Sequence, residues 1–214
     1  DNLIYVADRG AHTALKLTLD GELLLELGTR GHPSDTGCTE DSGEVLWASE
    51  PFNRPTRMAP STSGDIYVSD GYRNSRVHRF SANGAMIRSW GSAGNNAPGE
   101  FHVPHSVWVD EQGAIYVCDR ENNRIQIFSE TGDFISQWTN VDHPTDLYID
   151  ADDTIYVYER HDTSGDWISV RDRGGNILER WSSPRFHQIC VDSRGDIYGA
   201  EARNKTVTKL IRKR

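Results

Sequence analysis

Short runs in which apolar and polar residues alternate cover most of the chain, and they return in the same phase five times. Each copy is built around a tyrosine and ends with an acid, and the copies are residues 3–8, 65–70, 114–119, 154–159 and 196–201. Alternation with a period of two predicts short β-strands that bury one face. A motif that recurs in this way also predicts a repeat architecture.

Each full unit predicts four strands joined by tight turns. In the third unit the expected strands are residues 106–109, 115–118, 124–128 and 134–138. The segments between them carry the glycine, asparagine and glutamate or aspartate residues of tight antiparallel turns. A period of about forty residues with four strands is typical of propeller blades. We therefore predict an all-β propeller of four-stranded antiparallel blades, six in the complete ring and about five represented here.

The predicted domain is a single propeller, residues 1–214, whose ring is incomplete. The expected blades are residues 1–28, 53–91, 103–139, 142–181 and 183–214. The first begins at its second strand and the last stops after its third, which leaves two interpretations: a truncated six-bladed ring, or a smaller ring closed by its terminal strands. Truncation is favoured, because open blades expose strand edges and an apolar flank. Two inserts, residues 29–50 and 92–102, are predicted to be surface loops.

One position of the repeat changes residue type in a regular way. Eleven residues before the tyrosine, the last four copies carry Thr56, His105, Thr145 and His187. In a closed ring of six units this alternation places three imidazoles around the axis, which suits a centrally held metal ion. The third histidine would precede Asp1. The other histidines share no phase and are predicted to be ordinary surface residues: His12, His32, His78, His102, His143 and His161.

The charge and the cysteines of the chain limit its partners. The formal net charge is −9 at pH 7, with acids spread through the turns, whereas a nucleic-acid partner needs a basic face. No apolar run is long enough to cross a bilayer, so no membrane partner is expected. Cys38, Cys118 and Cys190 show no metal-type pairing and leave the compartment open, a secreted or extracytoplasmic location included.

Three short motifs, in order along the chain, carry a resemblance to a known family. They are Asp70-Gly71-Tyr72, Val103-Pro104-His105-Ser106 and Asp119-Arg120-Glu121-Asn122. The last motif alone is common among NHL repeats, but the three in this order resemble the NHL-repeat peptidyl-α-hydroxyglycine α-amidating lyases. The general NHL resemblance covers nearly the whole chain, and the lyase-like part covers the second and third units densely and the fifth loosely.

The resemblance implies a function and a set of site residues. Enzymes of this family split a peptidyl-α-hydroxyglycine into a peptide amide and glyoxylate, around a zinc ion bound by histidines from alternate blades. Carried over to this chain, His105 and His187 would be two zinc ligands and Tyr72 the catalytic base for the carbinol hydroxyl. Arg120 would bind the carboxylate during catalysis, and Arg76 is expected to bind substrate as well. A peptide or a small molecule is therefore the expected substrate.

The chain also departs from the family pattern beside its last expected ligand. Where the family has Met-Pro-His-Asp, this chain has Arg185-Phe186-His187-Gln188. The family's aspartate helps to hold a structural calcium ion, so Gln188 removes one ligand of a calcium cofactor while leaving zinc. Arg185 would bring a cation towards the channel, which suggests an altered substrate.

Two other functions stay open. An NHL propeller without catalytic activity would bind a protein or a small ligand on one face, because the fold alone carries no activity. A propeller hydrolase or lactonase would need a calcium-centred cluster of acids and amides, and none is found in phase. A Pro-His pair eleven residues before Tyr5 would favour the metal site, and a threonine there would favour the binding protein.

Overall fold

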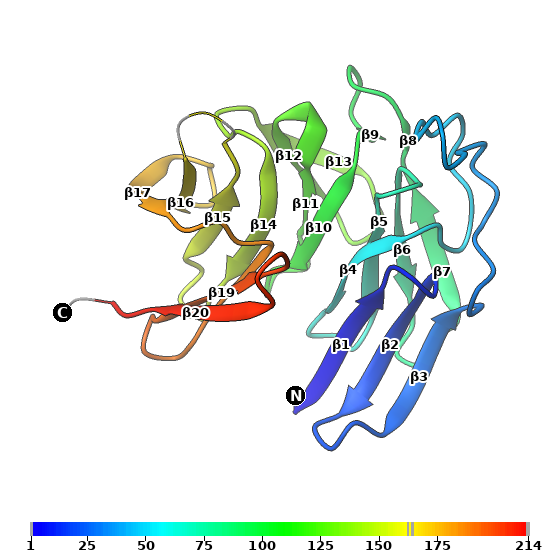
Figure 1. Cartoon of the computed structure of the whole chain (residues 1–214), viewed down its shortest axis with the longest axis horizontal. Helices are drawn as coiled ribbons and strands as arrows, with labels where there is room; N and C mark the ends of the chain where they lie inside the picture. Colours follow the sequence, from blue (N-terminus) through cyan, green and yellow to red (C-terminus); the bar gives the residue numbers. More distant parts are fainter. Residues whose placement is uncertain (1, 162, 164, 213–214) are drawn as a thin grey trace.

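Five antiparallel sheets follow one another along the chain and stand around a common centre (Figure 1). The computed structural model describes residues 2–161, 163 and 165–212, so residues 1, 162, 164 and 213–214 of the predicted domain lie outside the described residues. The fold is the all-β propeller that the repeats predict, with no α-helix in the part of the chain that is described. None of the described segments is a helix long and apolar enough to cross a membrane.

The three middle sheets have four strands each, paired in chain order. The second sheet comprises β4 (Pro55–Pro60), β5 (Ile66–Asp70), β6 (Arg76–Phe80) and β7 (Met86–Trp90). The third comprises β10 (Pro104–Val109), β11 (Ile115–Asp119), β12 (Arg124–Phe128) and β13 (Phe134–Trp138). The fourth comprises β14 (Pro144–Ile149), β15 (Ile155–Glu159), β16 (Asp166–Arg171) and β17 (Ile177–Ser183). The first and last sheets have three strands: β1 (Leu3–Asp8), β2 (Thr13–Thr18) and β3 (Leu23–Gly28), and β18 (Gln188–Val191), β19 (Ile197–Glu201) and β20 (Thr206–Leu210). A short 3-10 helix, η1 (Arg120–Asn122), joins β11 to β12.

The two inserts are more ordered than simple surface loops. The second contains a small parallel pair, β8 (Ser92–Ala93) and β9 (Glu100–Phe101), and the ring of Phe101 is buried against Phe128. In the first insert, the buried Thr36 donates its hydroxyl to the backbone oxygen of Arg73 at 2.7 Å. Both inserts therefore support neighbouring elements instead of lying free on the surface.

The acidic residue that ends each repeated motif has a structural role. In the three complete sheets its carboxylate accepts a hydrogen bond from a backbone N–H seventeen residues earlier, at the entry to the innermost strand of the same sheet. The pairs are Asn53 with Asp70 at 2.7 Å, His102 with Asp119 at 2.8 Å, and Asp142 with Glu159 at 3.0 Å. A buried backbone donor without a partner is costly, so each acid fixes the path of the chain into the channel-lining strand.

A β-bulge occupies the repeat position that alternates between threonine and histidine. The pairing of the innermost strand with its neighbour shifts register between Pro55 and Arg57, between Pro104 and Ser106, and between Pro144 and Asp146. The bulged residues are thus Thr56, His105 and Thr145. A bulge re-aims the side chain of its extra residue, which explains why this single position can point toward the channel.

His78 corrects one of the surface predictions. It lies on β6 opposite Val68, is fully buried, and meets the ring of Phe52 edge-on with 5.2 Å between the ring centroids. Because alternate residues of a strand share a face, its position two residues before the buried Phe80 places it in the interior. The prediction of a surface residue was therefore wrong for His78.

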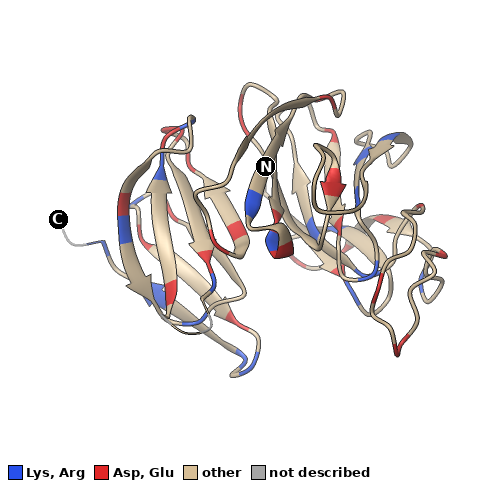
Figure 2. Cartoon of the chain, turned by 90° about the horizontal axis from the view of Figure 1, so that it is seen from above, with Lys and Arg blue, Asp and Glu red and all other residues tan. Residues whose placement is uncertain are grey.

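Charged residues of both signs are spread over the molecule. Acidic and basic positions are interspersed along the strands and turns of the ribbon (Figure 2). The net charge of −9 is therefore distributed, as the scattered acids of the sequence suggest.

Candidate active site in the central channel

Two imidazoles and a phenol converge at one point of the channel. The hydroxyl oxygen of Tyr72 lies 2.8 Å from Nε2 of His105 and 2.8 Å from Nε2 of His187. The centroids of the two imidazole rings are 4.9 Å apart. Tyr72 follows β5, His105 belongs to β10 and His187 directly precedes β18, so the fold brings these predicted site residues together from three sheets.

The neighbouring sheet sets the protonation of His105. Its Nδ1 lies 2.6 Å from the backbone oxygen of Thr145, and a carbonyl oxygen only accepts, so Nδ1 carries the proton. Nε2 of the neutral ring then keeps a free lone pair, which accepts the hydroxyl proton of Tyr72. The Tyr72 oxygen can in turn accept a hydrogen bond from Nε2 of His187. A metal ligand needs this same tautomer of His105.

Burial keeps the three groups neutral near pH 7. Desolvation lowers the pKa of His105 well below its ordinary value, and the charge of Arg120 lowers it further. Desolvation also lowers the pKa of His187, although the nearby carboxylate of Asp146 acts in the opposite direction. Burial raises the pKa of Tyr72 against the opposing charges of Arg120 and Arg9. In this state Tyr72 is a hydrogen-bonded phenol, so its use as a base requires a further group that stabilises the phenolate.

The turn that carries Tyr72 is held by its neighbours. The buried carboxylate of Asp70 accepts hydrogen bonds from the backbone N–H of Asn53 and from Nδ2 of Asn74, at 2.7 and 2.8 Å. A Cβ atom at Gly71 would collide with the backbone of Pro104. Glycine is therefore required here, because it lets the turn approach β10 closely enough for Tyr72 to reach His105.

Two guanidinium groups lie over the ring of Tyr72. Cζ of Arg9 is 5.2 Å and Cζ of Arg120 is 6.0 Å from the ring centroid. Nε of Arg120 donates to the carboxylate of Glu121 at 2.8 Å, which restrains that side chain. Arg9 was not among the predicted site residues, yet the sequence contained a signal for it. An arginine directly follows the acidic residue that ends the repeated motif in three copies, as Arg9, Arg120 and Arg160.

The structure does not bring the predicted substrate-binding residue Arg76 to this cluster. Arg76 lies on β6, where its guanidinium donates to the Ser89 hydroxyl at 2.6 Å, to the Gly91 carbonyl at 3.1 Å and to the Glu50 carboxylate at 2.7 Å. These contacts give Arg76 a structural role between β6, β7 and the first insert. A substrate-binding role for Arg76 therefore finds no support in its surroundings.

The imidazoles of His105 and His187 fit part of a zinc site. Their Nε2 atoms face the same oxygen, and zinc binds imidazole nitrogen at about 2.1 Å. Within residues 2–161, 163 and 165–212, no group of three or more histidine, cysteine, aspartate or glutamate side chains could hold a metal. A zinc ion would thus need further ligands from water, substrate or residues beyond those described. The same finding leaves a calcium site without support.

Comparisons with known proteins place these residues among NHL repeats. The family model for the NHL repeat matches residues 52–80 and 101–128, which include Tyr72, His105 and Arg120. The chain is 29% identical over 230 residues to peptidyl-glycine alpha-amidating monooxygenase B of Xenopus laevis, covering 98% of this chain and 25% of that protein. It is 34% identical over 128 residues to a probable peptidyl-alpha-hydroxyglycine alpha-amidating lyase of Caenorhabditis elegans, covering 58% of this chain and 33% of that protein.

Other similar proteins carry different names. Human NHL repeat-containing protein 3 is 31% identical over 144 residues, covering 64% of this chain and 38% of that protein. The chain thus spans 25% to 38% of the length of these three relatives. A solved structure of streptogramin B lyase superposes with a TM-score of 0.62 at 16% identity, covering 99% of this chain and 66% of that chain. This last likeness shows the propeller fold alone.

Proposed function

Because this chain is an NHL-repeat β-propeller related to the peptidylglycine α-amidating monooxygenases and the peptidyl-α-hydroxyglycine α-amidating lyases, we propose that it is an amidating-type lyase. The reaction would break the C–N bond of an N-acyl α-hydroxyglycine and form an amide and glyoxylate. The observation that carries the proposal is Tyr72, whose hydroxyl lies 2.8 Å from Nε2 of both imidazoles and whose ring lies under two guanidinium groups.

The arginines would hold the substrate by its carboxylate. Arg120 and Arg9 present their guanidinium groups beside the Tyr72 ring, and guanidinium binds carboxylate through paired, charge-assisted hydrogen bonds. A carboxylate held there places the neighbouring carbinol carbon close to the Tyr72 hydroxyl. The same grip would hold the glyoxylate until it leaves.

Tyr72 would move the proton. Its oxygen would take the proton of the carbinol hydroxyl while the C–N electron pair leaves with the amide nitrogen, which then receives a proton to give the neutral amide. Burial raises the pKa of Tyr72, so the arginine charges alone do not make it a base at neutral pH. In the structure described here the Tyr72 hydroxyl donates a hydrogen bond to the bare Nε2 of His105. Tyr72 would therefore first lose this proton to solvent, which a cation held by the two imidazoles would favour.

Zinc is the cofactor that the two imidazoles would hold. His105 and His187 would bind it through Nε2, and a bound zinc ion supplies Lewis acidity to an oxygen ligand and favours deprotonated oxygen nearby. In that state His187 would carry its proton on Nδ1, as His105 already does. An extracytoplasmic location remains a prediction that accompanies this proposal.

A binding propeller without catalysis is the second candidate. It is favoured by the similarity to human NHL repeat-containing protein 3, which covers 64% of this chain. In that case the channel mouth would bind an anionic ligand, and Tyr72 with its histidines would serve recognition instead of bond cleavage.

Release of glyoxylate tests the proposal. The full-length protein, purified without chelators and supplied with zinc, is incubated with N-benzoyl-α-hydroxyglycine, and glyoxylate is measured against the spontaneous rate. We expect catalysed release that Tyr72→Phe lowers about 10²- to 10⁴-fold and Tyr116→Phe leaves intact, because the Tyr116 hydroxyl bonds Asp110 away from the cluster. No release above the spontaneous rate, for this substrate and for a panel of peptide substrates, would favour the binding propeller.

A further inference from the structure

Arginines gather at one end of the channel although the chain as a whole is acidic. In three of the five sheets an arginine directly follows the acidic residue that ends the repeated motif, and these are Arg9, Arg120 and Arg160. Residues at one repeat position start at the same height around a propeller axis. Arg9 and Arg120 lie over the ring of Tyr72, and Arg160 lines a pocket together with His187. The proposed reaction uses Arg120 and Arg9, and leaves Arg160 without a task.

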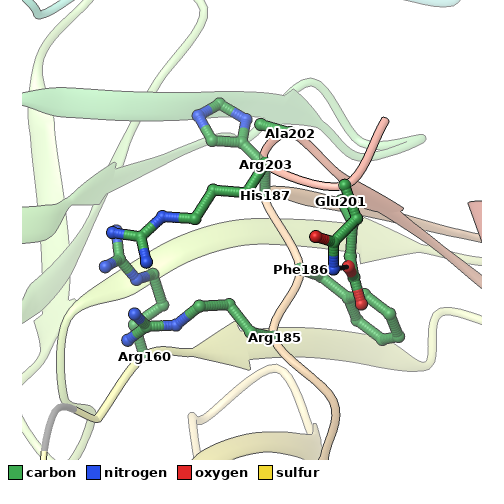
Figure 3. A pocket seen from close by; sticks show the side chains of 8 residues that line it. Arg160, Arg185, Phe186, His187, Glu201, Ala202 and Arg203 are labelled. Atoms are coloured by element: carbon green, nitrogen blue, oxygen red, sulfur yellow. Dashed lines mark hydrogen bonds between the residues drawn. The ribbon is translucent and has the colours of Figure 1, made fainter. Parts of the chain in front are cut away.

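Arg160 lines a separate pocket beside His187. The pocket has a volume of about 460 Å³, and its wall includes Arg160, Arg185, Phe186 and Arg203. Figure 3 shows the side chains of Arg160, Arg185 and Arg203 extending to the same side of this pocket, with the ring of Phe186 on the other side. A cavity of this size accommodates a small organic ligand. It adjoins the proposed reaction centre, because His187 belongs to both.

Two of these arginines have no carboxylate partner among the residues that the structure describes. Arg185 pairs with Asp166 at 3.2 Å, whereas no described carboxylate forms an ion pair with Arg160 or Arg203. Nε of Arg160 is buried and without a hydrogen-bond partner in the described part of the chain. A buried, charged donor left unpaired is costly, and a bound anion would satisfy it.

Glu201 is the acidic residue of the pocket wall, and it does not neutralise the arginines. Its carboxylate accepts a hydrogen bond from Nδ2 of Asn204 at 2.5 Å. The pocket therefore keeps an excess of positive charge next to a channel mouth that already holds Arg9 and Arg120. A concave site with one sign of charge selects ligands of the opposite charge.

We propose that the ligand of this site carries two carboxylates, one bound by Arg120 and Arg9 and the second bound in the pocket by Arg160 and Arg203. This inference rests on the proposed function for the first carboxylate, which is that of the α-hydroxyglycine. The second belongs to the acyl part that becomes the amide, so the substrate class is an acidic N-acyl or peptidyl α-hydroxyglycine. Phe186 offers an apolar wall to the short chain between the two groups.

Two unreactive probes of nearly equal shape test the second carboxylate. N-succinylglycine and N-butyrylglycine differ in one terminal carboxylate, and neither has the hydroxyl group that the lyase reaction needs. Calorimetry on the full-length protein should give a dissociation constant about tenfold or more lower for N-succinylglycine, because a charge-assisted contact is worth at least that factor. Equal dissociation constants for the two probes, or no binding of either, would overturn the inference.

Matched variants locate the contact. Arg160→Gln should remove the preference for N-succinylglycine, and the exposed Arg203→Gln should reduce it, which keeps the test valid if the first variant fails to fold. Arg194→Gln removes the same charge from a side chain 63% exposed and paired with Asp192, and should leave the preference unchanged. A preference that survives both pocket variants would place the second carboxylate elsewhere and contradict the assignment.

The outcome is separable from that of the proposed function. Binding of the probes requires no turnover. A preference for N-succinylglycine without glyoxylate release would therefore contradict the proposed lyase activity and support the two-carboxylate site. Glyoxylate release at equal KM from acidic and neutral N-acyl α-hydroxyglycines would keep the lyase and remove the second carboxylate.

Discussion

The bulged position of the innermost strands serves two purposes in neighbouring sheets. In β4, Thr56 donates its hydroxyl to the backbone oxygen of Pro104 in the adjacent sheet at 2.8 Å and lies 2.8 Å from the hydroxyl of Ser69. In β10, His105 uses Nδ1 for a similar contact between sheets, to Thr145, but keeps Nε2 for the channel. The Thr56 hydroxyl makes its hydrogen bonds to neighbouring strands, whereas His105 keeps Nε2 directed at the channel.

This difference shows how a repeat protein can obtain a reactive centre without changing its backbone. Thr56 and His105 occupy the same bulge position in their strands, and both tie one sheet to the next. The imidazole has a second polar atom on its far side, so the structural contact also orients the functional one. The comparison predicts that histidine variants lose metal and activity, while threonine variants lose stability only.

Removing His105 should have the largest effect. With His105→Ala we expect the full-length protein to lose more than about 100-fold in zinc affinity and to fall to the spontaneous rate of glyoxylate release, because a direct ligand matters more than the outer partners whose loss costs 10- to 100-fold. Elemental analysis and the glyoxylate assay measure both. His143→Ala is the control, since His143 is a half-exposed partner of Asp142 and Glu121 and does not contact Tyr72 or His187 in the described structure. Equal zinc content in the two variants would contradict the metal-binding role that the comparison with Thr56 assigns to His105.

Tyr72→Phe should come next, and it should act on turnover. Loss of the hydroxyl removes the proton acceptor of the proposed reaction, so kcat should fall about 10²- to 10⁴-fold while zinc content stays near one per chain. Circular dichroism and metal analysis check that the fold and the zinc site are intact. Unchanged kcat in a folded, zinc-loaded variant would show that Tyr72 only fills the space between the imidazoles.

Arg120→Ala should act on binding more than on turnover. The variant removes charge-assisted hydrogen bonds to the substrate carboxylate, so KM should rise about 10- to 100-fold with a smaller change in kcat. Arg88→Ala is a suitable control, because Arg88 is 49% exposed and makes only a long contact of 3.8 Å with Asp133. A KM equal to that of the unmodified protein would leave Arg9 as the carboxylate-binding residue.

Much of the fold was predictable because its signal is local and repeated. The alternation around each tyrosine and the turn residues between strands predicted β12 and β13 at their observed bounds, while β10 begins at Pro104, two residues before the predicted start. The bulge at His105 explains the early start, since a two-residue period does not continue through an extra residue. The fully buried His78 was missed because a polar residue at a strand position is read as exposed by default.

The site was predictable only in part. The common phase of His105 and His187 and the resemblance around Tyr72 named three residues that the fold then brings together over sequence separations of 33 and 115 residues. The anchoring of His105 by the Thr145 backbone could not be predicted, because it depends on a carbonyl of the next sheet. The contacts of Arg76 could not be predicted for a similar reason, since its partners Glu50 and Gly91 come from segments outside its own strand.

Replacing the threonines should have the smallest effect and tests the comparison most directly. Thr56→Val leaves the buried Pro104 oxygen without this donor and should lower the free energy of unfolding by about 1 to 3 kcal/mol. Thr145→Val loses one bond of 3.0 Å to the His143 oxygen and should cost about 1 kcal/mol. Zinc affinity and kcat should stay unchanged in both, because His105 is anchored by the backbone oxygen of Thr145, which valine retains. Denaturant unfolding and zinc titration measure these quantities. A loss of zinc affinity in Thr145→Val would mean that the hydroxyl, through the path of its strand, orients the imidazole, and that the two residue types are not independent in their roles.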